Sequence, residues 1–354
     1  MENHETTDGS HMMKGYDRLI GRRKMYLAAS IVVCVAAFFI DLTVGSSGMS
    51  VIDAIRTLVV PDQVTAMDRL IIYDIRLPAT TMAIAVGMSL ALAGSVMQTI
   101  LDNPMAEPYT LGISSSAGFG AALMIVVGSS AVGAMGMIMI SAGAFGCSMM
   151  ACLVIYMVAR FRASDKSTIL LTGIAIFFMF QALLSTMQLL ANSNQLSEIV
   201  FWMFGSLARC SLEQCGAVIL VLSISSIVFI FSSWRYTALK LGDAYASSLG
   251  VDVAGLRRRT LIVVSVLTSV AVCFVGTIGF IGLIAPHISR FLVGEDHRYY
   301  IPMSMAVGAI ILILANMLSK VVAAPSIFPV GILTSFIGIP FFFYLVLSKR
   351  RFAS

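Results

Sequence analysis

Long stretches without a charged residue constrain this chain more than any other feature of its sequence. A helix needs about 20 residues to cross the roughly 30 Å hydrocarbon core of a bilayer, and many of the uncharged stretches have this length. Only 12% of the residues are charged and 58% are hydrophobic, whereas a soluble domain carries about 25% charged residues. The chain therefore predicts an all-α polytopic membrane protein and excludes an ordinary water-soluble domain.

Nine runs have the composition of membrane-spanning helices, although the third is marginal because it is rich in Ser and Gly. They cover about 25–44, 78–101, 109–128, 132–158, 168–191, 215–233, 260–278, 301–319 and 329–347. A tenth, shorter segment at about 279–293 is interrupted by Pro286 and His287. A short or broken helix is tolerated in a membrane only where protein or water shields its freed backbone groups.

Loop charge decides between nine and ten crossings, because Lys and Arg prefer the cytoplasmic side of a membrane. Ten crossings with both termini inside place most of the 23 basic residues inside. Nine crossings would export the C-terminal Lys349, Arg350 and Arg351. We therefore expect ten transmembrane helices, one of them short or broken, and two cytoplasmic termini.

The two ends of the chain are predicted to lie outside the membrane domain. That domain is expected to cover 25–348, between a polar tail at 1–24 and a basic tail at 349–354. The tetrapeptide at 9–12, GSHM, is typical of a cloning remnant. The first apolar run is too long for a signal peptide and lacks a small-x-small cleavage site, so it is expected to be a retained span.

The predicted spans contain almost no charged residues, since Asp41 is the only ionic residue between their ends. Carriers coupled to protons or sodium keep ionisable groups near the bilayer midplane. A P-loop needs Gly-Lys-Ser/Thr, but the only Lys followed by Ser or Thr is Lys166, which follows Asp165. The chain is therefore expected to hold no cofactor, metal or nucleotide and to be no enzyme, so energy for transport would come from another chain.

The six cysteines show no metal-type CxxC pair and are interpreted as small buried residues. A local disulfide between Cys210 and Cys215 is the alternative if both face an oxidising compartment. The basic residues are spread between the apolar runs instead of forming one patch, so no nucleic-acid partner is expected.

Five motifs follow one another along the chain. They are RLPAT at 76–80, LAGSVMQTILDNPMAEPYTLGISSSAGFGA at 92–121, LGDAYASSLGVD at 241–252, GTIGFIGLIAPHISRFLVGEDHR at 276–298 and FPVGILTSFIGIPFFFYLVL at 328–347. Together they resemble the FecCD-type permease family, the membrane subunits of ATP-driven importers for ferric siderophores, haem and cobalamin. The resemblance implies two ten-helix copies around a central pathway in the prokaryotic cytoplasmic (inner) membrane. It also implies two separate ATPase subunits, which use ATP and Mg, and an extracytoplasmic substrate-binding protein.

In the family, the loop between the sixth and seventh spans forms short coupling helices that sit in a cleft of the ATPase, and here that loop is 234–259. The residues that match the docking motif are Gly242, Asp243, Ala246, Leu249 and Gly250. Small residues allow close approach, and Leu249 and Val251 are predicted to supply an apolar anchor. The alternative interpretation is a basic loop that is merely solvated.

Basic residues on the outer side are expected to hold the acidic residues of the binding protein. Arg76 and Lys320 match such positions in the family, although Ala79 stands where relatives often have a second basic residue. Because one exposed ion pair contributes at most about 1 kcal/mol, several pairs and shape must act together. The alternative for Arg76 is a snorkelling residue at the membrane interface.

Candidate pathway residues are less specific. Gly112, Ser116 and Gly120 recur every four residues and so share a helix face, which indicates either close helix packing or a pore wall. Ser167 and Thr168 match the place of a cytoplasmic gate in the family, although the preceding Lys166 departs from it.

The expected substrate is a metal chelate, with a ferric siderophore first, cobalamin second and haem third. Haem is disfavoured because no predicted span except the broken one contains a histidine. One rival is a stand-alone secondary transporter or channel, which would work without ATP. A second rival is an intramembrane enzyme, for which the spans offer no catalytic set.

Overall fold

A computed structural model describes residues 2–45, 48–128, 134–162, 165–323 and 326–348, and every element in these ranges is helical. The longer helices are α1 (Glu2–Thr43), α4 (Leu77–Ile100), α5 (Ile113–Val127), α6 (Ala134–Arg162), α7 (Lys166–Leu190), α8 (Ser193–Met203), α9 (Leu212–Phe231), α12 (Val253–Val275), α13 (Ile281–Val293), α14 (His297–Val322) and α15 (Val330–Ser348). The shorter elements are α2 (Val51–Val59), η1 (Pro61–Gln63), α3 (Ala66–Leu70), η2 (Ile71–Arg76), η3 (Pro108–Leu111), α10 (Ser233–Leu239) and α11 (Asp243–Ser248).

The all-helical membrane fold expected from the apolar runs is confirmed. Within the described ranges, seven helices are long and apolar enough to cross a membrane, and three shorter apolar helices accompany them at Ile113–Val127, Ile281–Val293 and Val330–Tyr344. The segment predicted to be short is α13, which has 13 residues. At 1.5 Å per residue it is about 20 Å long, so it covers only part of a bilayer. The expected interruption at Pro286 and His287 is wrong, because the helix runs through both residues and the break between α12 and α13 lies before Ile281.

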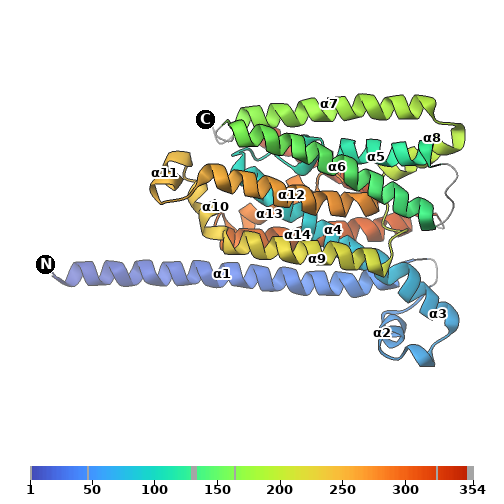
Figure 1. Ribbon diagram of the computed structural model, residues 1–354. Helices are drawn as coiled ribbons and strands as arrows, with labels where there is room; N and C mark the ends of the chain where they lie inside the picture. Colours follow the sequence, from blue (N-terminus) through green and yellow to red (C-terminus); the bar gives the residue numbers. More distant parts are fainter. Residues whose placement is uncertain (1, 46–47, 129–133, 163–164, 324–325, 349–354) are drawn as a thin grey trace.

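The long helices run side by side in one bundle (Figure 1). Helices α10 and α11 and the start of α1 lie at one end, here called the α11 end, and α2 and α3 lie at the other, here called the α2 end. Helix α4 forms the centre of the bundle. In the helical segment that contains α4, 83% of an apolar stretch of 18 residues is buried, whereas only 22% of such a stretch in α1 is buried. The centre of the bundle is therefore α4 with the helices packed on it, mainly α14, α13, α12 and α9.

Glycine pairs let α4 approach its neighbours closely. A Cβ atom at Gly94 would lie 1.9 Å from the carbonyl oxygen of Gly282 in α13. One at Gly87 would lie 2.4 Å from the carbonyl oxygen of Gly308 in α14. Since lipid tails are as apolar as the helices, close backbone packing of this kind is a main source of helix association in membranes.

Adding a methyl group at Gly94 is therefore expected to destabilise the bundle. We expect Gly94→Ala to lower the free energy of unfolding by about 1–3 kcal/mol, because the α4 and α13 backbones must move apart. Thermal unfolding of the purified protein in detergent measures the effect. Gly146→Ala in α6 is the matched control, since a Cβ at Gly146 meets nothing within 4 Å. Equal unfolding midpoints for the two variants would contradict this packing.

The helical segments at the first two spans are longer than the apolar runs. Helix α1 extends back to Glu2, so the polar residues before Met25 continue the first helix, and their place outside the membrane domain stays a prediction. The segment expected as a loop up to residue 77 contains α2, η1, α3 and η2, and the helix runs without a break from Ala66 to Ile100. Pro78 therefore lies inside a continuous helical segment and does not begin it.

The π-helical turn η2 explains how Pro78 is accommodated there. Proline normally disrupts a helix because it lacks an N–H and its ring clashes with the carbonyl four residues earlier. In η2 the backbone N–H of Leu77 bonds to the carbonyl of Ile72, five residues earlier. The wider turn moves the preceding carbonyls away from the proline ring, and such turns are frequent at functional sites.

Candidate coupling surface and central cavity

Two short helices, α10 and α11, form the α11 end of the bundle, where the sequence predicted coupling helices. Gly242 before α11 has φ +106° and Gly250 after it has φ +83°. Only glycine adopts such values at low cost, because other residues would bring Cβ into contact with the backbone. These two glycines therefore determine where α11 begins and ends.

Helix α11 presents an apolar stripe to its surroundings. Leu241, Tyr245 and Leu249 are 66%, 50% and 51% exposed. Tyr245 in α11 and Leu249 at its end are four residues apart and so lie on one side of the helix, whereas Leu241 lies in the turn before Gly242, which precedes α11. This set, called here the α11 stripe, contains the predicted anchor Leu249. The spacing of Leu241 and Tyr245 was visible in the sequence, but their partnership with Leu249 was missed.

Two residues of the predicted docking motif face the protein instead. Ala246 is fully buried and Val251 is 6% exposed, and both belong to the hydrophobic core beneath α11. The prediction that Val251 anchors a partner is therefore wrong in this structure, because its side chain packs on the protein itself. Val251 fixes the end of α11 to the bundle.

Asp243 joins α11 to three other helices. Its carboxylate accepts two hydrogen bonds of 2.8 Å from the Arg257 guanidinium in α12 and lies 3.5 Å from Lys166 Nζ in α7. Arg257 also donates through Nε to the carbonyl oxygen of Ile100 at the end of α4, at 2.9 Å. Burial alone would raise the pKa of Asp243, but the hydrogen bonds and charge of Arg257, with those of Lys166, hold it below its ordinary value. The α11 stripe is thus exposed on a firmly attached helix.

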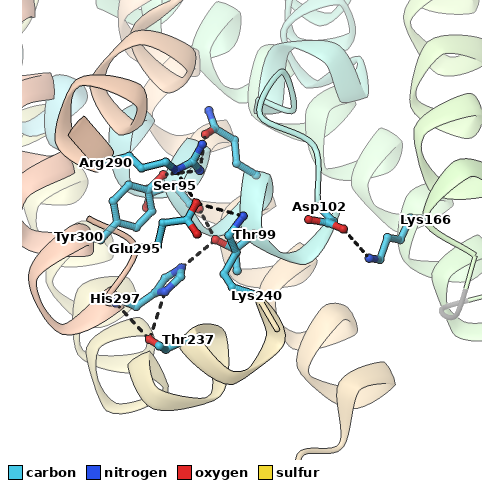
Figure 2. A network of polar contacts seen from close by, with 11 residues as sticks. Ser95, Thr99, Asp102, Lys166, Thr237, Lys240, Arg290, Glu295, His297 and Tyr300 are labelled. Atoms are coloured by element: carbon cyan, nitrogen blue, oxygen red, sulfur yellow. Dashed lines mark hydrogen bonds and ion pairs between the residues drawn. The ribbon is translucent and has the colours of Figure 1, made fainter. Parts of the chain in front are cut away.

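A second polar network attaches α10 to the bundle (Figure 2). Its centre is His297, the first residue of α14, whose side chain is almost completely buried. Its Nε2 lies 2.8 Å from Thr99 Oγ1 in α4, and its Nδ1 lies 3.3 Å from Thr237 Oγ1 in α10. The rings of Tyr236 and Tyr300 contact it on two sides. Sequence reasoning missed this role, since a single histidine at a helix start has no spacing signal.

A cavity of about 560 Å³ lies where the chain passes between α12 and α13. Phe280, directly before α13, has φ +68°, which is unusual for a residue with a side chain. The cavity is lined by residues from the breaks between helices and from α7, α8 and α15: Glu107, Tyr109, Gln188, Val200, Met203, Phe204, Thr277, Gly279, Phe280, Gly331, Ile332 and Ser335. The short helix α13 therefore begins beside a cavity, and a short helix in a membrane is tolerated where protein or a water-filled cavity surrounds its end.

Gly112, Ser116 and Gly120 lie in close helix packing. Gly112 precedes α5 with φ +77°, and a Cβ there would lie 2.8 Å from the backbone N of Phe177 in α7. Gly120 faces α6, where a Cβ would lie 2.1 Å from the Gly143 carbonyl oxygen. Ser116 is fully buried and donates to the carbonyl of Ile113. This placement favours packing over pore lining, and none of the three is among the described residues that line the cavity.

Ser167 and Thr168 form the first turn of α7 at the α11 end. Asp165 caps this turn, accepting the backbone N–H groups of Ser167 and Thr168 at 3.0 and 3.2 Å. The neighbouring Lys166 lies 3.3 Å from Asp102 in the turn after α4 (Figure 2). Their role as a gate stays a prediction.

Arg76 and Lys320 meet at the α2 end, but around an internal carboxylate. Asp41 is fully buried, its Oδ1 lies 2.8 Å from Lys320 Nζ, and Asn316 and Thr80 donate to its Oδ2 at 2.8 and 2.5 Å. Arg76 is buried beside it and donates to the Leu42 carbonyl at 2.6 Å. The predicted outward-facing docking pair is thus a buried cluster that joins α1, α4 and α14. The alternative of a snorkelling Arg76 also does not describe this side chain.

The cysteines, His287 and the basic residues at the C-terminal end were the other residues considered in the sequence. All six cysteines are free, so the alternative of a Cys210–Cys215 disulfide is not observed. The His287 ring lies 5.6 Å from that of Phe341, centroid to centroid. Among the described residues, no group of three or more His, Cys, Asp or Glu side chains could hold a metal ion. Lys349, Arg350 and Arg351 lie outside the described residues.

The bundle of long apolar helices, with the short helix α13 beside a cavity, is the architecture of a polytopic membrane protein. The family model for the FecCD transport family matches residues 33–348, and the chain belongs to that family. It is therefore the permease subunit of a metal-chelate type ABC importer.

Known relatives support this classification. A protein of Methanocaldococcus jannaschii named as an ABC transporter permease is 42% identical over 80% of this chain and 83% of its own length. The iron(3+)-hydroxamate import permease of Bacillus subtilis is 32% identical over 94% of this chain and 85% of its own. The cobalamin import permease of Halobacterium salinarum is 35% identical over 80% of this chain and 74% of its own length.

A solved structure has the same fold. It is described as an inward-facing conformation of a metal-chelate type ABC transporter and has a TM-score of 0.80 at 29% identity. The similarity covers 91% of this chain and 98% of that one.

Proposed function

We propose that the chain forms the pathway through which an iron–siderophore complex enters a prokaryotic cell across the cytoplasmic membrane. In this proposal two copies enclose the pathway, and each crosses the membrane ten times, with the seven long and three shorter apolar helices as the crossings. Both termini and the α11 end face the cytoplasm, in agreement with the distribution of Lys and Arg.

The α11 stripe is the observation that carries the proposal. Three large apolar side chains stand exposed at the end of a membrane protein, on α11 and the turn before it, and Asp243 and Arg257 attach this helix to the bundle. Exposed apolar groups on a rigid support are typical of the central contacts of a protein interface. We propose that an ATPase subunit covers this stripe, and that ATP and Mg bind only to that subunit.

The binding protein is proposed to dock at the α2 end. Because Asp41 already neutralises Lys320 and lies beside Arg76, a direct ion pair with a partner would require these cations to leave Asp41. We therefore propose that shape contacts at the α2 end supply most of the docking energy, with Arg76 and Lys320 in a secondary role.

The substrate follows from the relatives only as a class. The hydroxamate and cobalamin permeases are about equally similar to this chain. The siderophore is placed first because the hydroxamate relative matches more of the chain, and cobalamin is the second candidate.

ATP hydrolysis by the assembled transporter tests this proposal. The chain is purified with the ATPase and the binding protein of its transporter, placed in lipid discs, and supplied with ferric hydroxamates, cobalamin and haem in turn. We expect the ATPase to copurify and a ferric hydroxamate to stimulate hydrolysis. Stimulation by cobalamin alone would reverse the order of substrates. An ATPase that does not bind the chain would contradict the proposed function.

A further inference from the structure

Helix α10 contacts both α11 and α14, and it holds the turn between α13 and α14 at two points. Thr237 Oγ1 accepts the backbone N–H of His297 at 3.1 Å, and Lys240 Nζ lies 3.4 Å from Glu295 Oε1. Thr237 and Lys240 are three residues apart and so lie on one face of α10. A displacement of α10 therefore acts directly on this turn.

The first point of attachment continues through His297 into α4. Both ring nitrogens of His297 are engaged, one by Thr237 of α10 and the other by Thr99 of α4 (Figure 2). Thr99 also donates to the Ser95 carbonyl one turn earlier in α4. Because buried polar groups are costly to leave unpaired, this contact keeps α10 in register with the central helix.

The second point of attachment continues through Glu295 into α13. Glu295 Oε1 lies 3.0 Å from Arg290 Nε, and Arg290 is in the last turn of α13. Arg290 Nη2 also donates to the Tyr300 hydroxyl at 3.3 Å. One carboxylate thus joins a cation of α10 to a cation of α13.

Helix α13 is bounded by residues with unusual backbone angles. Phe280 before it has φ +68°, and Gly294 after it has φ +78°. Such residues at the ends of an element are where hinge motions are absorbed. Phe280 and Gly279 line the cavity, so α13 connects the polar turn at its end to the cavity at its start.

We propose that His297 and the Lys240–Glu295–Arg290 ion pairs transmit movement of α10 to α13 and so set the shape of the cavity at the start of α13. They act as positioning residues for transport, and this inference rests on the proposed function. Asp243 provides a separate attachment, since Arg257 joins α11 to α12 and to the end of α4. The route to the cavity therefore passes through α10, which carries none of the residues matched to the docking motif.

Loss of the ion pairs is expected to uncouple transport from hydrolysis. Lys240→Met, Glu295→Gln and the double variant are compared in vesicles with the ATPase and binding protein, with ferric hydroxamate as the probe. We expect each single variant to raise the ATP hydrolysed per chelate transported by about 3- to 30-fold, the range that coupling residues typically give. The double variant is expected to add little to the larger single effect, because both changes remove one interaction.

Arg298→Gln is the matched control. This substitution also removes a positive charge, but Arg298 pairs with Asp296 of the same turn, at 2.8 Å. The Arg298→Gln variant is expected to hydrolyse as much ATP per chelate transported as the wild type. His297→Ala is expected to uncouple as well, and if it fails to fold, the Lys240 and Glu295 variants still decide. Thermal unfolding is measured in parallel, since a merely structural role would lower stability without changing the ratio.

The possible results separate this inference from the function on which it rests. A wild-type chain that does not bind the ATPase would overturn both. A wild-type transporter that is stimulated by chelate, together with Lys240 and Glu295 variants that keep its ratio of ATP to chelate, would overturn the inference alone.

Discussion

Replacing Leu249 by Glu is expected to abolish chelate-stimulated ATP hydrolysis while leaving the membrane protein folded. The side chain is half exposed on the α11 stripe, so a charge there costs the isolated chain little. In a complex the same charge would be buried in the apolar centre of the interface without a partner. A central interface residue of this kind commonly contributes about 2 kcal/mol or more, so we expect binding of the ATPase to weaken by about 30-fold or more.

Copurification of the ATPase and its stimulated activity measure this effect. Ser247→Glu is the matched control, because Ser247 is exposed on α11 but points away from the α11 stripe. Gly242 is less suitable, since any side chain at its φ of +106° would also strain the backbone. Normal stimulation in Leu249→Glu would remove the assignment of α11 as the docking helix.

Neutralising Asp41 is expected to be the most destabilising single change at the α2 end. In Asp41→Asn the buried Lys320 loses its ion pair and Arg76 loses the nearby negative charge. Breaking a buried pair by removing one partner typically costs about 3–5 kcal/mol, because the remaining charge is left without compensation. Thermal unfolding of the purified protein should show a clearly lower midpoint for this variant.

Two further variants identify the cause. Asp62→Asn is the control, since its contact with Arg69 at the same end spans 3.9 Å between exposed side chains and should contribute little. Adding Lys320→Met to Asp41→Asn is expected to recover most of the lost stability, because the buried cation is then removed. An Asp41→Asn protein as stable as Asp62→Asn would contradict the description of this cluster.

The positions of the main helices were predictable from the sequence because the bilayer requires uncharged runs of fixed length. The shortness of α13 was also predictable from the length of its apolar stretch, but its break was not, because the helix continues through Pro286 and begins after Phe280. The helices between Thr43 and Leu77 were not, because α2 and α3 are short and amphipathic and lack a span's signature. The π-helical turn before Pro78 has no pattern of its own in a single sequence.

The sequence predicted where the candidate sites lie along the chain better than it predicted which side chains contact each other there. The sequence indicated the coupling loop, and Gly242 and Gly250 in that loop lie just before and just after helix α11. It did not show that Val251 is buried while Tyr245 is exposed, because a helix of six residues is too short for a clear periodicity. The contacts of Asp41 with Lys320 and of His297 with Thr99 join residues about 200 or more positions apart. Only the fold brings them together.

Uptake into sealed vesicles tests the central claim most directly. The chain, its ATPase and its binding protein are reconstituted, and a radiolabelled ferric hydroxamate is supplied with ATP on one side of the membrane. We predict accumulation only when ATP is on the side of the α11 end and the binding protein is on the side of the α2 end. Equal chelate transport by the chain alone, without ATP or partners, would contradict the account and indicate a stand-alone transporter or channel.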